Sequence, residues 1–530
     1  MAAIKVLIAD KLSEDGVAIL RGAPELSVDV KTGLTPPQLA ELIGPYEGLI
    51  VRSATKVTAE VIAKAERLRV IGRAGVGVDN VDAQAATKRG IIVMNVPAGN
   101  TISTAEHTIS MLLALARRIP QAYSSLRGGQ WERNKFVGTE VFGKTLGIIG
   151  LGKIGLEVAR RAQAMGMRVL AHDPFLSSER TQQLDVQMAE LARVYAEADF
   201  ITVHTPLTAE TKHMIGREAL TRMKRGVRLI NCARGGIIDE QALAEAVTSG
   251  HVGGAAVDVY EQEPPPTDHP LLSLEQVICT PHLGASTQEA QQNVAVEVAK
   301  QVLDALLGRG IRNAVNMPSV DGQTLLVLQP YIVLGEKLGS LATQLFGGQT
   351  AEVRVTYVGD ITKHDTSPVT LAVLKGLLAP VVGENVNYVN ASVIAAERGV
   401  KVIEAKASQM DEFATLLALD VRVDGKAHAL QGTLSARREP RIVKIGPYFV
   451  EAVPDGHMLI IHNQDRPGLI GNLGTLLGKA GINIAAMSNG RDAPGGTAIT
   501  VVNIDQPIPD DVLARVGELA HVVDAKLIRL

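Results

Sequence analysis

The sequence contains very little cysteine and few aromatic residues. Only Cys232 and Cys279 occur among 530 residues. Two cysteines cannot form a disulfide framework, and no CxxC pair suggests a zinc site. We therefore expect a reducing, cytoplasmic environment and no metal centre. Phe, Trp and Tyr together make up 3% of the chain, so the cores are expected to be aliphatic, as in layered α/β proteins.

The chain also lacks an excess of charge of either sign. Its 53 Lys and Arg residues nearly balance 56 Asp and Glu residues, for a formal net charge of −3. Without a strong overall field, neither nucleic acid nor an anionic membrane surface is an expected partner. No uninterrupted apolar run approaches the roughly 18 residues of a membrane span, and the N-terminus shows no cleavable signal pattern. These absences predict a soluble intracellular protein.

Length and local pattern predict several folded domains. At roughly 100–200 residues per domain, the chain corresponds to three or four. The first hundred residues alternate short β-branched runs with helical patterns, which predicts βαβ units around a parallel sheet. The strands expected in this segment are 5–10, 26–30, 48–52, 70–73 and 91–95.

A second α/β series follows a long helical pattern over residues 101–130. Its strands are expected to form one doubly wound parallel sheet. Residues 319–455 then mix strands and helices, and residues 456–530 follow the βαββαβ order of a ferredoxin-like domain. The six strands of the second series are expected at 145–150, 168–173, 200–204, 227–231, 255–258 and 277–280.

A GxGxxG motif, Gly150-Leu-Gly152-Lys-Ile-Gly155, lies between a predicted strand and a predicted helix. Such glycines permit a tight turn and let the backbone approach a pyrophosphate, whose charge faces the helix N-terminus. Asp173 ends the next strand, at about the spacing of a carboxylate that binds the adenine ribose. The motif therefore predicts NAD rather than NADP. The alternative is a plain strand-to-helix turn.

Three polar clusters follow later strands of the second series. They contain Arg234 in NCARGG, Glu263 in DVYEQEP and His282 in TPHLGA. Because ligands bind at the carboxyl ends of parallel strands, we expect these side chains to converge. Oxidation of a 2-hydroxy acid fits them: His282 takes the hydroxyl proton, Glu263 fixes its tautomer, and Arg234 clamps the carboxylate. Each residue alone also fits a surface or capping role. His107 and His204 lack such a context and are expected to be structural.

The motifs GLGKIG, NCARGGIID, DVYEQEP and TPHLGAST together resemble those of the NAD-dependent D-isomer-specific 2-hydroxyacid dehydrogenases. The length and the C-terminal layout are similar to the long-form members of that family, which oxidise 3-phosphoglycerate in serine biosynthesis. RSATKV (52–57) and RAGVGVDNVD (73–82) strengthen the likeness. The resemblance implies two doubly wound parallel-sheet domains, then an α+β intervening domain and a ferredoxin-like ACT domain. Their implied ranges are 1–99 with 288–318 (substrate-binding), 100–287 (Rossmann, NAD-binding), 319–455 (intervening) and 456–530 (ACT, regulatory).

The resemblance also implies functional residues. Catalysis falls on Arg234, Glu263 and His282, in a cleft between the substrate-binding and NAD-binding domains. Because 3-phosphoglycerate carries up to three negative charges, further basic residues are needed. Substrate contacts are expected at Arg52, Ser53, Arg73, Gly75, Asn100 and Arg133. NAD contacts are expected at Val76, Gly150, Gly152, Lys153, Ile154, Gly155, Asp173, Thr205, Cys232, Ala233, Arg234, Asp258, His282, Leu283, Gly284 and Ala285.

The ACT-like region contains the strand-to-helix turn Asn463-Gln-Asp465-Arg-Pro467. Pro467 suits a first helical turn, and free N–H groups beyond it are suited to an amino-acid carboxylate. Asp465 would pair with the ammonium group, and Asn483 would add a hydrogen bond across a dimer interface. By resemblance the effector is L-serine. The alternative is a unit that only dimerises.

Three functions stay open at this level. The first is NAD-dependent oxidation of 3-phosphoglycerate to 3-phosphohydroxypyruvate, with feedback by L-serine. The second is turnover of another small D-2-hydroxy acid, such as glycerate, glycolate or 2-hydroxyglutarate, because a family-level match fixes chemistry better than substrate. The third is an NAD-sensing binding protein without turnover. Contacts through two domains predict a homodimer or homotetramer.

Overall fold

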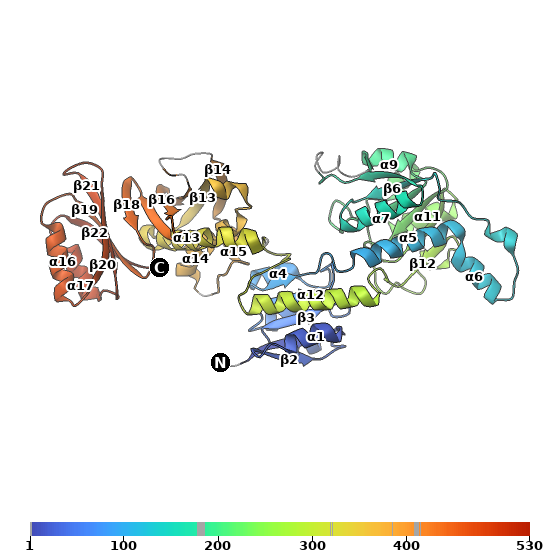
Figure 1. Ribbon diagram of the computed structural model, residues 1–530, viewed down its shortest axis with the longest axis horizontal. Helices are drawn as coiled ribbons and strands as arrows, with labels where there is room; N and C mark the ends of the chain where they lie inside the picture. The colour runs from blue at the N-terminus through green and yellow to red at the C-terminus, as the bar shows by residue number, and fades with distance from the viewer. Residues whose placement is uncertain are drawn as a thin grey trace.

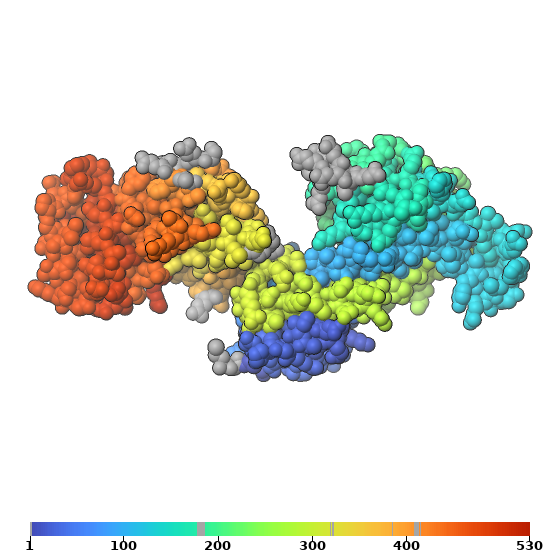
Figure 2. All heavy atoms as spheres, viewed as in Figure 1, coloured from blue at the N-terminus to red at the C-terminus, as the bar shows by residue number. Residues whose placement is uncertain are grey.

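The computed structural model describes residues 3–176, 186–318, 320, 322–383, 385–407, 413 and 415–530. Residue 319, the expected start of the intervening domain, lies outside the described residues. The described strands form sheets of five, seven, six and four strands. We call the sheets with their helices the first to fourth units. In Figure 1 the second unit (green) lies to the right of the first (blue), and the third and fourth lie to the left. Figure 2 shows the third and fourth units in close contact.

The first unit is a parallel sheet of order β2-β1-β3-β4-β5, as the alternating pattern predicts. Outside β2, which has no buried residue, most of its strand residues are buried aliphatic side chains, because helices cover both faces. The strands are β1 (Ile4–Ile8), β2 (Leu26–Val30), β3 (Gly48–Val51), β4 (Val70–Arg73) and β5 (Ile92–Met94), and the helices are α1 (Glu14–Arg21), α2 (Pro36–Leu42), α3 (Ala59–Lys64) and α4 (Ala83–Lys88).

Helix α12 (Gln288–Leu306) comes from much later in the chain and packs on this first sheet (Figure 1). Gly72 in β4 permits the close approach, because a Cβ there would lie 2.5 Å from Val302 Cγ2. Val294, Val298 and Val302 face the sheet and are buried in its core. The chain therefore returns to the first unit after completing the second.

The second unit is a parallel sheet of order β12-β11-β10-β9-β6-β7-β8. Strand order reverses on either side of β6, the arrangement that opens a ligand crevice at the carboxyl ends of β6 and β9. The six expected strands are present, with the two-residue β8 added. The strands are β6 (Thr145–Ile149), β7 (Arg168–His172), β8 (Gln187–Met188), β9 (Phe200–Val203), β10 (Val227–Asn231), β11 (Val252–Val257) and β12 (Val277–Cys279). The helices are α7 (Lys153–Ala164), α9 (Leu191–Glu197), α10 (Arg217–Thr221), α11 (Glu240–Thr248) and the 3-10 turn η2 (Pro270–Ser273).

The single helix expected over residues 101–130 is wrong, because the structure has two. Helix α5 (Thr101–Arg117) ends at Arg118, whose φ of 51° is left-handed, and α6 (Ile119–Arg127) begins with Pro120 in its first turn. Proline is compatible with a first turn but would clash inside a continuous helix. Helix α6 and the 3-10 turn η1 (Arg133–Phe136) consequently form an arm that projects from the second unit (Figure 1).

The third unit is a mixed sheet of order β14-β13-β15-β16-β17-β18, covered by helices α13, α14 and α15. Within the described residues, Gln323–Phe346 of α13 is long and apolar enough to cross a membrane, but half of its most apolar 18-residue stretch is buried inside the structure. Its residues Leu334, Leu338 and Leu341 are fully buried in the core of the unit, so it is a core helix here. The elements are α13 (Gly322–Phe346), β13 (Thr350–Val358), η3 (Asp360–Lys363), α14 (Ser367–Val382), α15 (Ala391–Glu397), β14 (Lys401–Ala407), β15 (Leu416–Val423), β16 (Lys426–Leu434), β17 (Pro440–Ile445) and β18 (Tyr448–Ala452).

The fourth unit is an antiparallel sheet of order β20-β21-β19-β22 with the expected βαββαβ connectivity. One face packs on α16 and α17. The other face, with Ile460, Val501 and Ile528, joins the core of the third unit, and the two units abut in Figure 2. The predicted fold class is thus confirmed. The elements are β19 (His457–Gln464), α16 (Leu469–Lys479), β20 (Ile484–Arg491), β21 (Thr497–Ile504), α17 (Asp510–Gly517) and β22 (Val522–Arg529).

Candidate active site

The turn after β6 is tight on its protein side and open on its other side. Gly150 has φ 92°, and a Cβ there would lie 2.8 Å from the His204 carbonyl. A Cβ on Gly155 would lie 2.2 Å from the Gly150 oxygen, whereas at Gly152 nothing lies within 4 Å. Gly150 and Gly155 are therefore required by packing, and Gly152 leaves room in front of the α7 N-terminus. This is the shape that a pyrophosphate needs.

The residues around this turn also fit a dinucleotide. Asp173 accepts hydrogen bonds from the backbone N–H groups of Leu151, at 2.8 Å, and Phe175, at 2.9 Å. The carboxylate of Asp173 is thus held at the carboxyl end of β7, beside the turn that contains Gly150 and Gly152. Thr205 lies next to Gly150, and its Oγ1 is buried without a hydrogen-bond partner. A buried hydroxyl without a partner is costly unless a ligand supplies one.

His282 and Glu263 form a direct pair. Nδ1 of His282 lies 2.7 Å from Oε2 of Glu263, and both side chains are about two-fifths exposed. Because an ionised carboxylate only accepts, Nδ1 carries the proton and Nε2 has a free lone pair. Burial opposes ionisation of Glu263, but the hydrogen bond and charge of His282 and the charge of Arg234 outweigh it, and the pKa of Glu263 is lowered. His282 has a left-handed φ of 55°, a conformation that tertiary contacts must hold.

The loop that carries Arg234 is fixed by its neighbours. Asn231 accepts from the Ala233 N–H at 3.0 Å and donates to the Arg234 carbonyl at 2.9 Å. Gly235 packs against the next loop, since a Cβ there would lie 2.0 Å from the Tyr260 carbonyl. The Tyr260 N–H in turn donates to Glu263 at 3.1 Å. The loops bearing Arg234 and Glu263 therefore share one packed arrangement.

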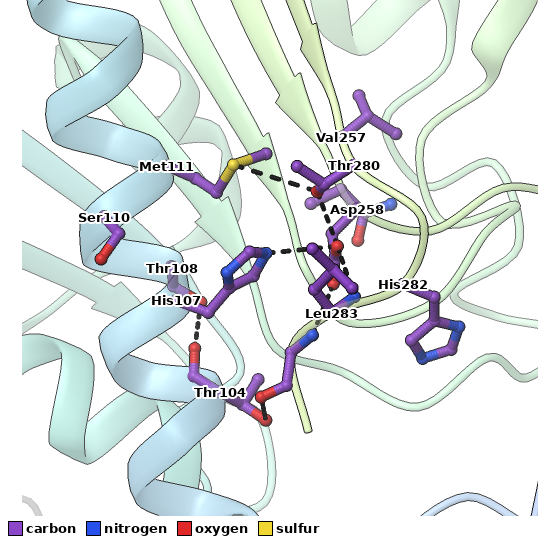
Figure 3. A network of polar contacts seen from close by, with 12 residues as sticks. Thr104, His107, Thr108, Ser110, Met111, Val257, Asp258, Thr280, His282 and Leu283 are labelled. Atoms are coloured by element: carbon purple, nitrogen blue, oxygen red, sulfur yellow. Dashed lines mark hydrogen bonds and ion pairs between the residues drawn. The ribbon is translucent and has the colours of Figure 1, made fainter. Parts of the chain in front are cut away.

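Asp258 organises the loop that carries His282 (Figure 3). Its carboxylate accepts from Thr280 Oγ1 at 2.6 Å and from the N–H groups of Leu283 at 2.8 Å and Gly284 at 2.9 Å. Its carbonyl accepts from the His282 N–H at 2.8 Å. Burial opposes ionisation of this carboxyl, but the hydrogen bonds outweigh it and lower its pKa. Asp258 therefore positions the predicted cofactor residues from His282 onwards, which continue to Ala285.

His107 also takes part in this network, which sequence reasoning missed. It lies on α5, and its Nε2 is 3.2 Å from Asp258 Oδ1 (Figure 3). Cys232 lies close by. A ring nitrogen of His107, the Sγ of Cys232 and a carboxylate oxygen of Asp258 all lie within 4.8 Å of one another. Burial, with the charge of Asp258, raises the pKa of the Cys232 thiol. No local motif around His107 predicts this contact, because it depends on how α5 packs.

Arg52, Arg73 and Arg234 come together where the first and second units meet. Burial, followed by the charge of Arg234, lowers the pKa of Arg73 to about 10, and Arg52 acts in the same direction. Arg73 Nε is buried without a hydrogen-bond partner. Arg234 Nε donates to Asp79 of the first unit at 2.9 Å. A concentration of guanidinium groups of this kind is suited to an anionic ligand.

Among the other predicted substrate and cofactor residues, Gly75 lies directly against Arg73. Gly75 has φ 150°, and a Cβ there would lie 1.7 Å from Arg73 Nη1. Val76 follows it, Ser53 is exposed beside Arg52, and Asn100 directly precedes α5, with its Oδ1 buried and unpartnered. Lys153 and Ile154 begin α7.

Arg133 is the exception among the predicted substrate residues. It lies in η1, on the arm that projects away from the first unit (Figure 1). The chain by itself does not bring Arg133 to the other arginines.

The predicted effector residues do not converge. Asp465 lies in a cavity of about 520 Å³ at the start of α16, where it pairs with Arg491 Nη1 at 2.8 Å. The Asn463 side chain is buried against Thr500, and Asn483 donates to Asp505. Only Asp465 of the three lines the cavity. The sequence analysis missed Arg491, which is far from the turn along the chain.

Comparison with protein-family models gives three consecutive matches. Residues 109–284 match the NAD binding domain of D-isomer specific 2-hydroxyacid dehydrogenases, 327–446 match the D-3-phosphoglycerate dehydrogenase intervening domain, and 457–521 match the ACT domain. Together with the glycine turn and the His282–Glu263 pair, these matches define an NAD-dependent D-isomer-specific 2-hydroxyacid dehydrogenase with a C-terminal ACT domain.

Individual relatives narrow the class. The chain is 46% identical over 529 residues to the D-3-phosphoglycerate dehydrogenase of Archaeoglobus fulgidus, covering 99% of this chain and 100% of the relative. It is 43% identical to that of Bacillus subtilis, covering 99% of each. The chain belongs to the D-3-phosphoglycerate dehydrogenase family, in its long form with intervening and ACT domains, and its cofactor is NAD.

Solved structures match about three-fifths of the chain. The TT0316 protein of Thermus thermophilus is 38% identical with a TM-score of 0.55, and it covers 59% of this chain and 100% of its own. A D-lactate dehydrogenase from Aquifex aeolicus, complexed with NAD and lactic acid, is 30% identical with a TM-score of 0.53 and the same coverage.

Proposed function

We propose that the chain oxidises 3-phospho-D-glycerate to 3-phosphohydroxypyruvate, the first step of L-serine biosynthesis. The observation that carries the proposal is the His282–Glu263 pair at 2.7 Å, with Arg234 close enough to lower the pKa of Glu263. A general base, its orienting carboxylate and an anion-binding guanidinium are the groups that oxidation of a 2-hydroxy acid requires. Bound NAD supplies the hydride acceptor.

His282 is the proposed general base. Its Nε2 lone pair takes the proton of the C2 hydroxyl, while Nδ1–H stays hydrogen-bonded to Glu263. The carboxylate stabilises the imidazolium that forms and keeps the ring in the orientation that its strained backbone sets. Asp258 holds the same loop from the other side through the Leu283 and Gly284 N–H groups.

The arginines are the proposed substrate ligands. Arg234 binds the carboxylate and polarises the forming ketone, since a guanidinium fork matches a carboxylate better than an ammonium does. Arg73 and Arg52 are proposed for the 3-phosphate, with Ser53, Gly75 and Asn100 around them. The unpartnered Arg73 Nε supports this assignment, because a phosphate oxygen would complete it.

The test is NADH production from 3-phosphoglycerate at alkaline pH, with the keto product trapped and D-glycerate as control. Turnover that requires the phosphate supports the proposal. Turnover on glycerate or another D-2-hydroxy acid alone would contradict the substrate assignment. No turnover on any of them would favour an NAD-sensing binding protein.

L-serine is the proposed effector, bound at the cavity of the ACT domain. Asp465 and Arg491 offer one charge of each sign at its wall, and backbone N–H groups of the α16 N-terminus face the same side. A bound amino acid would replace the Asp465–Arg491 ion pair with two new ones, in which its ammonium group pairs with Asp465 and its carboxylate pairs with Arg491. The supporting experiment is inhibition of turnover by L-serine with D-serine as control.

A homodimer or homotetramer is the proposed assembly. The arm after α5 exposes large apolar side chains, including Tyr123 at 65%, Leu126 at 58%, and Trp131 and Val137 at 77% each. Exposed apolar surface of this kind on a projecting element is typical of an interface between subunits. Sedimentation of the intact chain and of a Trp131→Glu variant tests it. A variant that sediments as the wild type does would contradict this placement.

The compartment and the domain boundaries are proposals of the same kind. We propose a cytoplasmic enzyme, although relatives include chloroplastic forms from Arabidopsis thaliana. We keep 1–99 with 288–318, 100–287, 319–455 and 456–530 as the domain boundaries. Limited proteolysis followed by mass mapping checks the boundaries.

A further inference from the structure

An ion pair joins the two units that form the active site. Arg234 follows β10 in the second unit, and Asp79 lies in the loop after β4 in the first unit. The Arg234 Nε–H donates to Asp79 Oδ2 at 2.9 Å. The contact can exist only when the two units stand in this relative position.

The loop of Asp79 is held firmly by its own unit. The neighbouring Asn80 donates from Nδ2 to the carbonyls of Arg52 and Thr55, each at 2.6 Å, and its own carbonyl accepts from the Val57 N–H at 2.8 Å. Asp79 itself is 67% exposed at its side chain. A pair this exposed contributes little to stability, so its position in the site needs another explanation.

The pair fixes the plane of the Arg234 guanidinium. Nε is bound to Asp79, Nη1 donates to the Ala233 carbonyl at 2.6 Å, and Nη2 lies beside Gly77, where a Cβ would be only 1.8 Å away. A carboxylate can meet a guanidinium bidentately along its Nε edge or along its Nη1–Nη2 edge. Because Asp79 occupies Nε and Ala233 takes one N–H of Nη1, the second N–H of Nη1 and those of Nη2 are left to bind a substrate along the Nη edge.

Asp79 also moderates the charge of the arginine cluster. Burial and the charges of Arg234 and Arg52 lower the pKa of Arg73, whereas Asp79 acts against that shift. Three guanidinium groups close together repel one another before an anion arrives. A carboxylate at the edge of the cluster reduces that repulsion without occupying the Nη edge.

We propose that Asp79 is a positioning residue for the reaction: when the two units meet, its carboxylate holds Arg234 through Nε so that the Nη edge faces the substrate carboxylate. The inference rests on the proposed substrate. The carboxylate site is thereby complete only when the two units stand in this relative position. Asp79 acts only through Arg234 and does not itself touch substrate.

The test compares Asp79→Ala and Asp79→Asn with the wild type in the full-length enzyme. Losing a hydrogen bond to a charged group weakens binding by about 10-fold or more. We expect the KM for 3-phosphoglycerate to rise about 10-fold in Asp79→Ala and less in Asp79→Asn, which keeps an acceptor oxygen. Because carboxylate binding is common to ground and transition states, the KM should change more than kcat, which falls only as far as Arg234 polarises the forming ketone less well. The KM for NAD and the unfolding midpoint should not move.

The matched control is Asp82→Asn. Asp82 lies three residues away and caps α4 by accepting from the Ala85 N–H at 2.9 Å, so its loss leaves the KM for 3-phosphoglycerate unchanged. Calorimetric titration of 3-phosphoglycerate into the NADH complex gives a second reading that does not need turnover, with the same 10-fold loss expected in Asp79→Ala.

An unchanged affinity in Asp79→Ala would overturn the proposal. A tighter affinity would also overturn it, because Asp79 would then compete with substrate for Arg234. Equal losses for 3-phosphoglycerate and NAD would indicate general disruption and count against it as well. Failure of the proposed function is distinct, since the wild type itself would then neither bind nor turn over 3-phosphoglycerate.

Discussion

The catalytic region and the ACT cavity differ in how their polar side chains are engaged. At the carboxyl ends of β10, β11 and β12, hydrogen bonds from neighbouring residues hold the functional side chains or their loops in place. Glu263 is hydrogen-bonded to His282, and Asn231 is hydrogen-bonded to the loop of Arg234. In the ACT domain the expected effector residues bind other partners: Asp465 binds Arg491, and Asn483 binds Asp505.

The difference follows from geometry. Parallel strands bring several loops to one edge of a sheet, so residues far apart along the chain meet by construction. The ACT sheet is antiparallel, and the turn that carries Asp465 lies beside the N-terminus of α16. The catalytic site is thus preorganised within one chain, whereas the ACT cavity has an internal ion pair that an effector would have to replace.

The largest expected effect tests the catalytic side of this comparison. His282→Ala should lower kcat by about 10²–10⁴-fold and leave NAD affinity intact, because only the proton acceptor is lost. The matched control is His213→Ala, since His213 forms a similar half-exposed pair with Glu261 at 2.8 Å. Steady-state kinetics and NADH titration measure both. Normal turnover without His282 would end its assignment as the base.

A smaller loss of kcat is expected when His282 is kept but the carboxylate of Glu263 beside it is removed. Glu263→Gln should lower kcat about 10- to 100-fold, because the imidazolium is no longer stabilised. Steady-state kinetics of Glu263→Gln and of the wild type measure the loss. An unchanged kcat would show that Glu263 does not act through His282.

Acid sensitivity should also differ between the two regions. His204 follows β9 and lies against Gly150 of the glycine turn. Burial lowers the pKa of its side chain from 6.5 to about 4. The unfolded chain therefore binds more protons between these values, and stability falls as pH falls from 6.5 towards 4. The loss at pH 5 is about 2 kcal/mol, and His204→Gln should remove it.

The control for that measurement is His462→Gln in the ACT domain. Burial lowers the pKa of His462, but the charge of Asp524 opposes the shift. His462→Gln should therefore restore less of the stability that is lost at pH 5 than His204→Gln does. Thermal unfolding at pH 7 and pH 5 compares the three proteins. Equal pH dependence in wild type and His204→Gln would show that His204 is not held neutral by the fold.

The smallest effect is expected at the ACT cavity. Arg491→Ala should raise the L-serine concentration for half inhibition about 10-fold, the cost of one charge-assisted contact, without changing uninhibited turnover. Arg515→Ala on α17 removes the same charge from outside the cavity and is the control. If both variants respond to serine as the wild type does, the cavity is not the effector site.

Local sequence patterns determined much of this protein. The glycine motif, the alternation of strands and helices, and the βαββαβ order at the C-terminus predicted the fold class, because each depends on neighbouring residues and on the two periodicities of secondary structure. The break at Arg118 was missed, although Pro120 signalled it, because the apolar pattern continues across the turn.

Tertiary structure decided the contacts that join distant segments. His107 meets Asp258, and Arg234 meets Asp79, across 151 and 155 positions of the chain. No local spacing encodes such contacts, since they depend on how α5 packs on the second sheet and how the two α/β units meet. The sequence by itself thus determined which chemical groups stand at the strand ends. Only the packing of helices and units decided which partner residue holds each of these groups in place. The surfaces that meet there are built from residues far apart in the chain.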